Sequence, residues 1–426
     1  MIEIDSVRTG NFVGNAQRGV SGTQCKHRIF FSVRLLAINM ASNKRELNSE
    51  IVTSFLLNTC RLCPKPGKDS AQAAVYCAVV ASKHPVDKAE TRIIPLLTGS
   101  VAEFYIEPML PHVTDIDVMF HYSTVLAIPQ GQSPPKRLSA EFHNWLHVFE
   151  IIDSHVPGYV YLKLHYLLSE CDDEGKYNAV EYERHAYLSN RCYLDDDSDI
   201  HGPALFKVHP GTLLSSDDVH CVRCLSWPSQ AADWPTRHRI CDWPDSATIN
   251  HVVNNGCDVV PVAHRQCRTD KWMGKYQWRM SFSRAEIVLI NSWMPVQQIV
   301  YHMLRVFMKH ERLTDSVDTS EGDKCSNYHI KTLMLWQSEL KRRNLFCDDL
   351  DLVKICVQLL NMLAEWLTDA LCPHYFISNC NLIDNSFSVT NIVGQLMSID
   401  ETWLSTWFVD NTKMFSALFG LYYATV

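Results

Sequence analysis

The chain has 426 residues, 46% hydrophobic and 20% charged, so it is long enough to bury a sizeable core without stabilising disulfides. The net charge of −8 excludes a protein that is basic overall, so any contact with nucleic acid requires a local basic face. The 16 cysteines are scattered along the chain, which is typical of reduced thiols and predicts a cytoplasmic location. No apolar run reaches the ~18 residues of a membrane-spanning helix, so no membrane contact is expected.

The folded unit is expected to begin near Met40, with residues 1–39 as a peripheral leader. The apolar side chains of Leu47, Ile51 and Phe55 recur at helical spacing and predict a helix over about residues 44–63. A second helix is predicted over about residues 69–83.

From about residue 92 the spacing of the apolar residues changes from that of a helix to that of strands. Residues 92–98 form an apolar run that ends in Gly99-Ser100, and residues 115–121 alternate strictly. In that alternation, Asp115 and Asp117 face one side of the strand. Further strands are predicted at 159–167, 219–225 and 258–262.

After about residue 283 the chain is predicted to be all-helical. Ser283 and Glu286 have the spacing of a capping box, and Pro295 is suited to the first position of a helix. Residues 296–307 carry an apolar stripe with helical period, Ser326 is placed to cap a helix through about residue 342, and a further helix is predicted over 349–370. We therefore expect a core lobe at 40–283 and a helical lobe at 284–426.

Two Cys-x-x-Cys pairs, Cys60 with Cys63 and Cys221 with Cys224, have the local spacing of zinc ligands. About 160 residues separate the pairs, so buried free thiols are the favoured interpretation and no zinc is predicted.

The paired carboxylates suggest a two-metal site. Two Asp residues at positions i and i+2 of a strand point to one face, and carboxylate oxygens are the ligands that Mg²⁺ prefers. Gly99 lets the backbone approach a phosphate closely, and Ser100 supplies a hydroxyl. Asp258, at the start of a later strand, is the predicted third carboxylate. The alternatives are a solvated strand face for Asp-x-Asp and a plain turn for Gly-Ser.

Five segments resemble the cyclic GMP-AMP synthase-like receptors of the male-abnormal (Mab) protein family, and the resemblance covers about residues 45–385 in order. They are Thr98-Gly-Ser, Asp115-Ile-Asp-Val-Met-Phe, Cys224-Leu-Ser-Trp-Pro-Ser-Gln-Ala-Ala-Asp-Trp, Trp278-Arg-Met-Ser-Phe-Ser-Arg-Ala-Glu and Asn327-Tyr-His-Ile-Lys-Thr. The resemblance implies an α+β, bilobed nucleotidyltransferase fold: a mixed β-sheet core with a spine helix, and an all-helical C-terminal lobe.

The resemblance also implies roles for single residues. Asp115, Asp117 and Asp258 would hold two Mg²⁺ or Mn²⁺ ions, and Ser100 would grip a phosphate of a nucleoside triphosphate such as ATP or GTP. Tyr328 would stack on a nucleobase, and Lys331 would hold a triphosphate. Base and phosphate would be read by Arg279, Ser281 and Ser283. The alternatives are a packing anchor for Tyr328 and a solvated helix face for Lys331.

The segment 286–295 contains no His or Cys, unlike the zinc ribbon of the vertebrate DNA-sensing synthase, which favours double-stranded RNA as the activating ligand. The candidate RNA contacts are Lys44, Arg45, Lys341, Arg342 and Arg343, although such residues are usually solvated helix ends. The leading hypothesis is a nucleic-acid-activated cyclic dinucleotide synthase of innate immune signalling. The alternatives are a catalytically silent scaffold of the same family and a polymerase that makes linear products.

Overall fold

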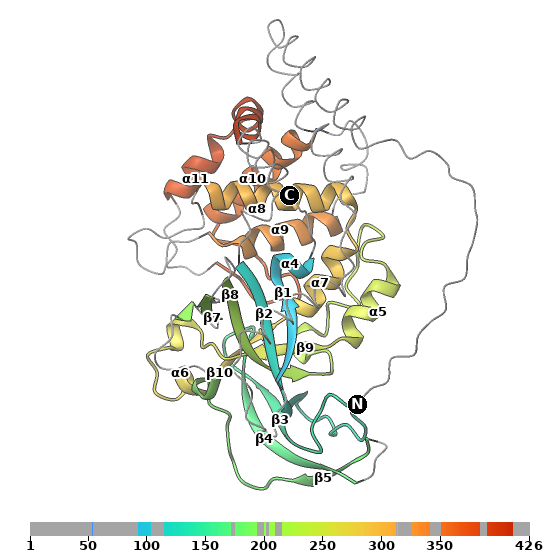
Figure 1. Ribbon diagram of the computed structural model, residues 1–426. Helices are drawn as coiled ribbons and strands as arrows, with labels where there is room; N and C mark the ends of the chain where they lie inside the picture. Colours follow the sequence, from blue (N-terminus) through green and yellow to red (C-terminus); the bar gives the residue numbers. More distant parts are fainter. Residues whose placement is uncertain are drawn as a thin grey trace, which may run out of the picture.

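The computed structural model describes Thr53 and residues 93–103, 115–171, 175–193, 200–201, 204–208, 215–311, 313, 325–340, 351–383 and 390–411 of the chain. In this part a mixed sheet is followed by a run of helices, so the fold is α+β (Figure 1). The predicted helices at 44–63 and 69–83 lie outside the described residues, apart from Thr53, which is helical. None of the described helices is both long and apolar enough to cross a membrane.

Ten described strands form one sheet, in the order β1-β2-β3-β4-β10-β9-β8-β7-β6, with β5 beside β4. Their bounds are β1 Ile93–Thr98, β2 Asp115–Pro129, β3 Trp145–Asp153, β4 Tyr159–Glu170, β5 Tyr177–Glu181, β6 Ile200–His201, β7 Ala204–Val208, β8 Ser215–Cys224, β9 Cys257–Val260 and β10 Gln277–Ser281. The sheet is mixed, because β2 runs parallel to both β3 and β8 while the other pairs are antiparallel.

Strand β2 organises this sheet. Its first half lies between β1 and β8, and in its second half β3 takes the place of β1. Because β2 also pairs with β8, the strands β2, β3, β4, β10, β9 and β8 form a closed circuit of neighbours. Asp117 is paired on both sides, with Thr98 of β1 and Asp217 of β8, and Asp115 is paired with Ser215 of β8.

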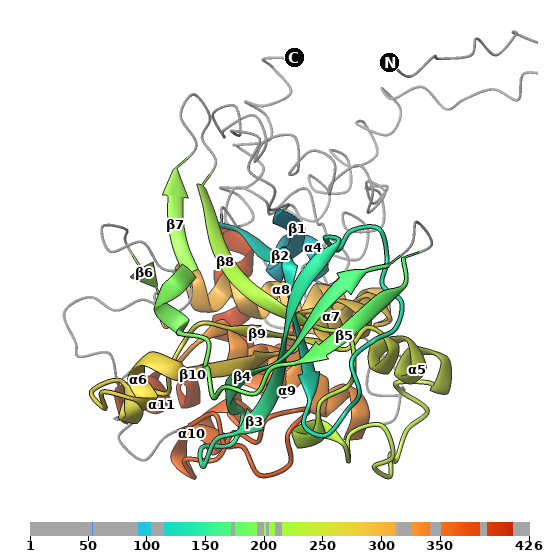
Figure 2. The same ribbon diagram turned by 90° about the horizontal axis from the view of Figure 1, so that it is seen from below.

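The helices are α4 Gly99–Glu103, α5 Ser246–Asn254, α6 Met273–Tyr276, α7 Ser283–Asn291, α8 Pro295–His310, α9 Asn327–Leu340, α10 Leu352–Thr368 and α11 Thr390–Met397. Residues 401–411 are also helical. Helices α8 to α11 gather at one end of the molecule, and β3, β4 and β5 lie at the opposite end (Figures 1 and 2). One large apolar cluster continues from β9 and β10 into α7, α8, α9 and α10.

The predicted helix starts have mixed outcomes. Pro295 is the first residue of α8, as predicted, and the side chain of Asp351 caps α10. The capping box predicted for Ser283 and Glu286 is wrong, because Phe282 occupies the cap position and Ser283 Oγ contacts Ser281 Oγ instead.

A buried charge cluster joins the loop after β8 to the helical end. Arg237 donates to both carboxylate oxygens of Glu339 on α9, at 2.8 and 2.6 Å, and to the carbonyl oxygen of Tyr375 at 2.7 Å. The Arg237 guanidinium also lies 4.4 Å from the ring centroids of both Trp336 and Tyr375. The Arg237 guanidinium therefore makes three hydrogen bonds and lies against two aromatic rings. These contacts fix the loop after β8 against α9.

We expect Glu339→Leu to lower the free energy of unfolding by about 3–5 kcal/mol, because Arg237 and Arg239 would keep buried charges without their acidic partner. Thermal and urea unfolding measure this loss. The double variant Arg237→Met, Glu339→Leu is expected to recover part of the stability. A single variant as stable as the natural protein would show that the cluster does not hold the loop.

Candidate active site

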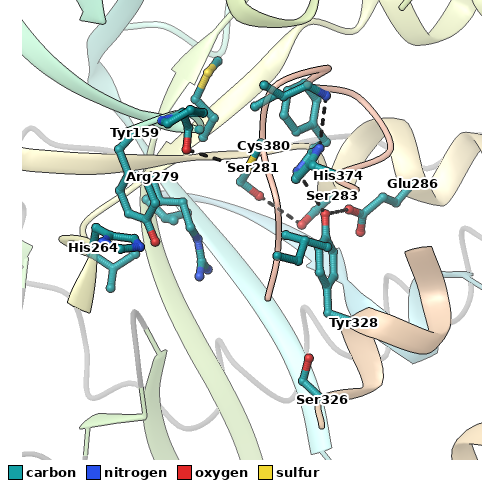
Figure 3. A pocket seen from close by; sticks show the side chains of 18 of the residues that line it. Tyr159, His264, Arg279, Ser281, Ser283, Glu286, Ser326, Tyr328, His374 and Cys380 are labelled. Carbon is teal, nitrogen blue, oxygen red and sulfur yellow. Dashed lines mark hydrogen bonds between the residues drawn. The ribbon is translucent and has the colours of Figure 1, made fainter. Parts of the chain in front are cut away.

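A cavity of about 700 Å³ opens between the sheet and the helices. Its floor includes Thr98, Gly99 and Asp117 from β1, α4 and β2, and its opposite wall includes Tyr328 and Lys331 from α9. Figure 3 shows the wall formed by β10, α7 and α9. The structure thus brings together residues that are more than 200 positions apart in the sequence.

Gly99 is required by its contact with Asp117. It has a left-handed φ of +61°, and a Cβ atom at this position would overlap the Asp117 carboxylate. Thr98, opposite Asp117 in the β1–β2 register, donates its hydroxyl to the Asp117 carbonyl oxygen at 3.3 Å. A side chain other than hydrogen at residue 99 would therefore displace the carboxylate.

A second carboxylate lies beside Asp117, and it is Asp217. The two residues are direct partners in the parallel register of β2 and β8, so their side chains share one face of the sheet. Burial, reinforced by the negative charge of Asp217, raises the pKa of Asp117 from 3.8 to about 6. Two like charges on neighbouring strands form a site that a divalent cation would stabilise.

The prediction that Asp258 is the third carboxylate of this group is corrected by the structure. Asp258 is fully buried on β9, and its Oδ2 accepts from Arg284 Nε at 2.7 Å. Its Oδ1 lies 3.9 Å from Cys221 Sγ on β8, four residues beyond Asp217, which is roughly 13 Å at the usual strand rise. Burial alone would lower the pKa of Arg284, but the adjacent Asp258 raises it, as expected for a committed ion pair.

The structure places Ser100 in α4 and Asp115 at the start of β2, opposite Ser215. The metal contact predicted for Asp115 and the phosphate contact predicted for Ser100 stay predictions. In the part of the chain that the structure describes, no three His, Cys, Asp or Glu side chains are grouped as a metal site. Asp117 and Asp217 nevertheless have the hard oxygen donors that fit Mg²⁺ or Mn²⁺.

The segment predicted to read base and phosphate forms one side of the cavity. Arg279, Ser281 and Ser283 all line it, and the two serine hydroxyls lie 3.1 Å apart (Figure 3). These hydroxyls come from the end of β10 and the start of α7, which follow each other directly in the chain. Each hydroxyl retains further hydrogen-bonding capacity toward the cavity.

Tyr328 lines the cavity from α9, and its hydroxyl is held by two groups. It donates to Glu286 Oε1 at 3.0 Å and lies 3.4 Å from His374 Nε2 (Figure 3). The backbone N–H groups of Phe376 and Ile377 donate to His374 Nδ1, so the proton belongs on Nε2, which donates to the tyrosine oxygen. Burial and the charge of Arg279 lower the pKa of His374 to about 3, so the ring is neutral.

Lys331 is not on a solvated helix face, since its side chain is only 13% exposed. Its ammonium group contacts Glu286 Oε2 at 2.8 Å and also donates to Glu103 Oε1. Glu103, Glu286 and His374 were absent from the predicted site. In the sequence, Glu286 is recognisable only through its capping-box spacing from Ser283, which gives no indication of a contact with Lys331 or Tyr328.

The predicted RNA contacts, Lys44, Arg45, Lys341, Arg342 and Arg343, all lie outside the described residues. Of the two Cys-x-x-Cys pairs, Cys60 and Cys63 also lie outside them. Cys221 and Cys224 are buried free thiols on β8.

Comparison with known families agrees with this architecture. Residues 195–292 match the Mab-21 protein nucleotidyltransferase domain, and residues 297–398 match the Mab-21 protein HhH/H2TH-like domain. The chain belongs to the Mab-21 family. The first match contains Asp217 and the Ser281–Ser283 segment but begins after Asp117, so the place of Asp117 in a Mab-21 site rests on the geometry described above.

The Mab-21 relatives include "Protein mab-21-like" of Drosophila melanogaster, which is 26% identical over 155 residues. That alignment covers 35% of this chain and 39% of the relative. The similarity therefore spans well under two thirds of the relative's length.

We expect Gly99→Ala to weaken Mn²⁺ binding and to lower stability by more than the ~1 kcal/mol of backbone strain, because its Cβ would overlap the Asp117 carboxylate. Gly131→Ala is the matched control: Gly131 also has a positive φ, +74°, but a Cβ there meets nothing within 4 Å. Calorimetric Mn²⁺ titration and thermal unfolding compare the two variants. Equal losses in both would refute a special contact at Gly99.

We expect Asp117→Asn to raise the melting temperature at pH 7.5. The folded-state pKa of about 6 lies above the unfolded value of 3.8, so the ionised carboxylate destabilises the protein above pH 6. At 1.36 kcal/mol per pH unit, this amounts to about 3 kcal/mol at most, and it disappears as the pH falls from 6 toward 3.8. Melting curves between pH 4 and 8 should converge at the acidic end; an asparagine variant less stable at pH 7.5 contradicts this account.

Proposed function

We propose that this Mab-21 protein is a metal-dependent nucleotidyltransferase that joins two nucleoside triphosphates into a cyclic dinucleotide in the cytoplasm, as an innate immune signal. The observation that carries the proposal is Asp117, which lies against Gly99 at the floor of a cavity of about 700 Å³ and has a second carboxylate, Asp217, as its register partner on β8. The nucleotidyltransferase domain match supports the reaction class.

In the proposed reaction, a sugar hydroxyl of one nucleotide attacks the α-phosphorus of the other, and the bond to pyrophosphate breaks. A second such step in the same cavity closes the ring. Two Mg²⁺ or Mn²⁺ ions would neutralise the charge that develops on the attacking and leaving oxygens. Asp117 and Asp217 would hold these ions together with Asp115, and Gly99 would leave room for the phosphates beside Ser100.

The cavity walls supply the groups that would orient the nucleotides. Ser281 and Ser283 present paired hydroxyls, and Arg279 presents a cation. The Tyr328 hydroxyl is anchored between Glu286 and His374, which fixes the orientation of its ring. A fixed aromatic ring on a cavity wall is suited to stacking on a base, which is worth about 1–3 kcal/mol.

Activation by double-stranded RNA is part of the proposal and is supported by the sequence resemblance alone. Duplex RNA is recognised through its shape and backbone, so a local patch of Lys and Arg is sufficient even on a chain with a net charge of −8.

One observation favours the second candidate, a catalytically silent scaffold. Lys331, which would hold a triphosphate, is engaged by two carboxylates instead. In a scaffold this cluster would simply link α4, α7 and α9.

The deciding experiment incubates the purified protein with the four labelled nucleoside triphosphates, Mg²⁺ or Mn²⁺, and either long duplex RNA or duplex DNA. We expect a phosphatase-resistant product with RNA. It should be lost in Asp117→Asn and Asp217→Asn without loss of stability, because each change removes one of two crowded charges. Phosphatase-sensitive linear products would indicate a polymerase, and no product with any ligand would favour the scaffold.

Asp258→Asn serves as the contrasting variant. It removes the partner of buried Arg284 and should lower the melting temperature markedly. If Asp258→Asn stays fully stable yet makes no product, while Asp217→Asn remains active, then Asp258 rather than Asp217 is the third carboxylate.

A further inference from the structure

Lys331 lies between two buried glutamates that come from different helices. Glu103 is the last residue of α4 and Glu286 lies in the first turn of α7; their side chains are 1% and 4% exposed. The Lys331 ammonium group donates to both of them. Burial alone would lower the pKa of Lys331, but the two carboxylates raise it well above its ordinary value, so the lysine is charged.

The charge balance of this trio opposes anion binding. One ammonium and two carboxylates sum to −1, so an incoming triphosphate would meet a net negative cluster. Two of the three ammonium donors are already used within the protein. For Lys331 to bind a phosphate group, at least one of these carboxylate contacts must be given up.

Of the two carboxylates, Glu103 is the one that can be released without dismantling the cavity wall. Glu286 lines the cavity and also anchors the Tyr328 hydroxyl. Glu103 is not among the lining residues, and within the described residues its second side-chain hydrogen bond is from the Tyr301 hydroxyl, which donates to Glu103 Oε2 at 3.2 Å. If Lys331 leaves Glu103, the remaining pair of Lys331 and Glu286 is neutral.

Glu103 is also coupled to the carboxylate floor through a very short helix. Helix α4 has five residues; it begins at Gly99, which packs against Asp117, and ends at Glu103. Its carbonyl at Ala102 accepts from Asn291 Nδ2 on α7 at 3.2 Å. A displacement of α4 therefore changes the contact at Asp117 and the contact at Lys331 together.

We propose that Glu103 is a positioning residue that withholds Lys331 from phosphate groups, and that triphosphate binds Lys331 when α4 shifts and the Glu103 contact breaks. This inference rests on the proposed function, because it concerns how the same cavity accepts its substrate. It assigns a regulatory role to a residue that contacts neither the substrate nor the metal ions.

The test measures binding of inorganic tripolyphosphate by calorimetry, without metal and without turnover. We expect Glu103→Gln to bind at least about tenfold more tightly than the natural protein, which corresponds to 1.4 kcal/mol. The gain should vanish in Glu103→Gln, Lys331→Met, which subtracts any binding at other cations. Glu365→Gln on the exposed face of α10 makes the same charge change elsewhere and should leave the affinity unchanged.

Glu103→Asp provides a second variant if the glutamine form fails to fold. It keeps the charge but shortens the reach to Lys331 by one methylene, so a smaller gain in affinity is expected. A folded Glu103→Gln or Glu103→Asp protein with unchanged tripolyphosphate affinity, or a gain that persists without Lys331, overturns the inference. A gain in affinity without any nucleotide product would leave the inference standing and refute the proposed enzyme.

Discussion

The close approach of the Asp117 carboxylate to the Cα atom of Gly99 is the contact on which the rest of the site depends. It requires β1 to be followed directly by a residue without a side chain, and it requires β2 to lie between β1 and β8 at this point. The same pairing sets Asp217 beside Asp117, so the strand register itself creates a crowded pair of acids. Burial and like charge raise the pKa of Asp117, which means that the ionised carboxylate destabilises the folded protein. Such a destabilised pair is characteristic of sites that bind cations.

On the opposite wall, a continuous polar network lies beside the apolar cluster of α7 and α9. Two backbone N–H groups fix the tautomer of His374, His374 and Glu286 fix the Tyr328 hydroxyl, and Glu286 shares Lys331 with Glu103. Buried networks of this kind are rigid when every member is satisfied, and each member constrains its neighbours. The Tyr328 ring, Lys331 and α4 are therefore linked through one network.

Many of the helices and strands that carry the site could be predicted from local patterns in the sequence. The apolar run before Gly99, the alternation at Asp115–Asp117 and the stripe of α8 each reflect the period of a single element. The position of Asp217 beside Asp117 could not be predicted, because it depends on which strands pair and in what register. The apolar residues of β8 start at Val219, so the strand was predicted to begin there, and Asp217 fell outside it. Asp258 precedes an equally apolar strand, and only the fold reveals that Arg284 neutralises it. Glu286 fits a capping box locally, but Lys331 and Tyr328, more than 40 residues away, engage its carboxylate.

Both ends of α4 lie at charged groups that would change if the cavity takes up a triphosphate as proposed. At Gly99 the Asp117–Asp217 pair would be neutralised by a cation, and at Glu103 the lysine would be released from an anion. A five-residue helix is too short to absorb a shift at one end without moving the other, since it contains little more than one turn. Metal binding at the floor and the freeing of Lys331 at the wall are thus expected to be thermodynamically linked. An activating ligand that displaced α4 would alter both at once, without contacting either the carboxylates or the nucleotide.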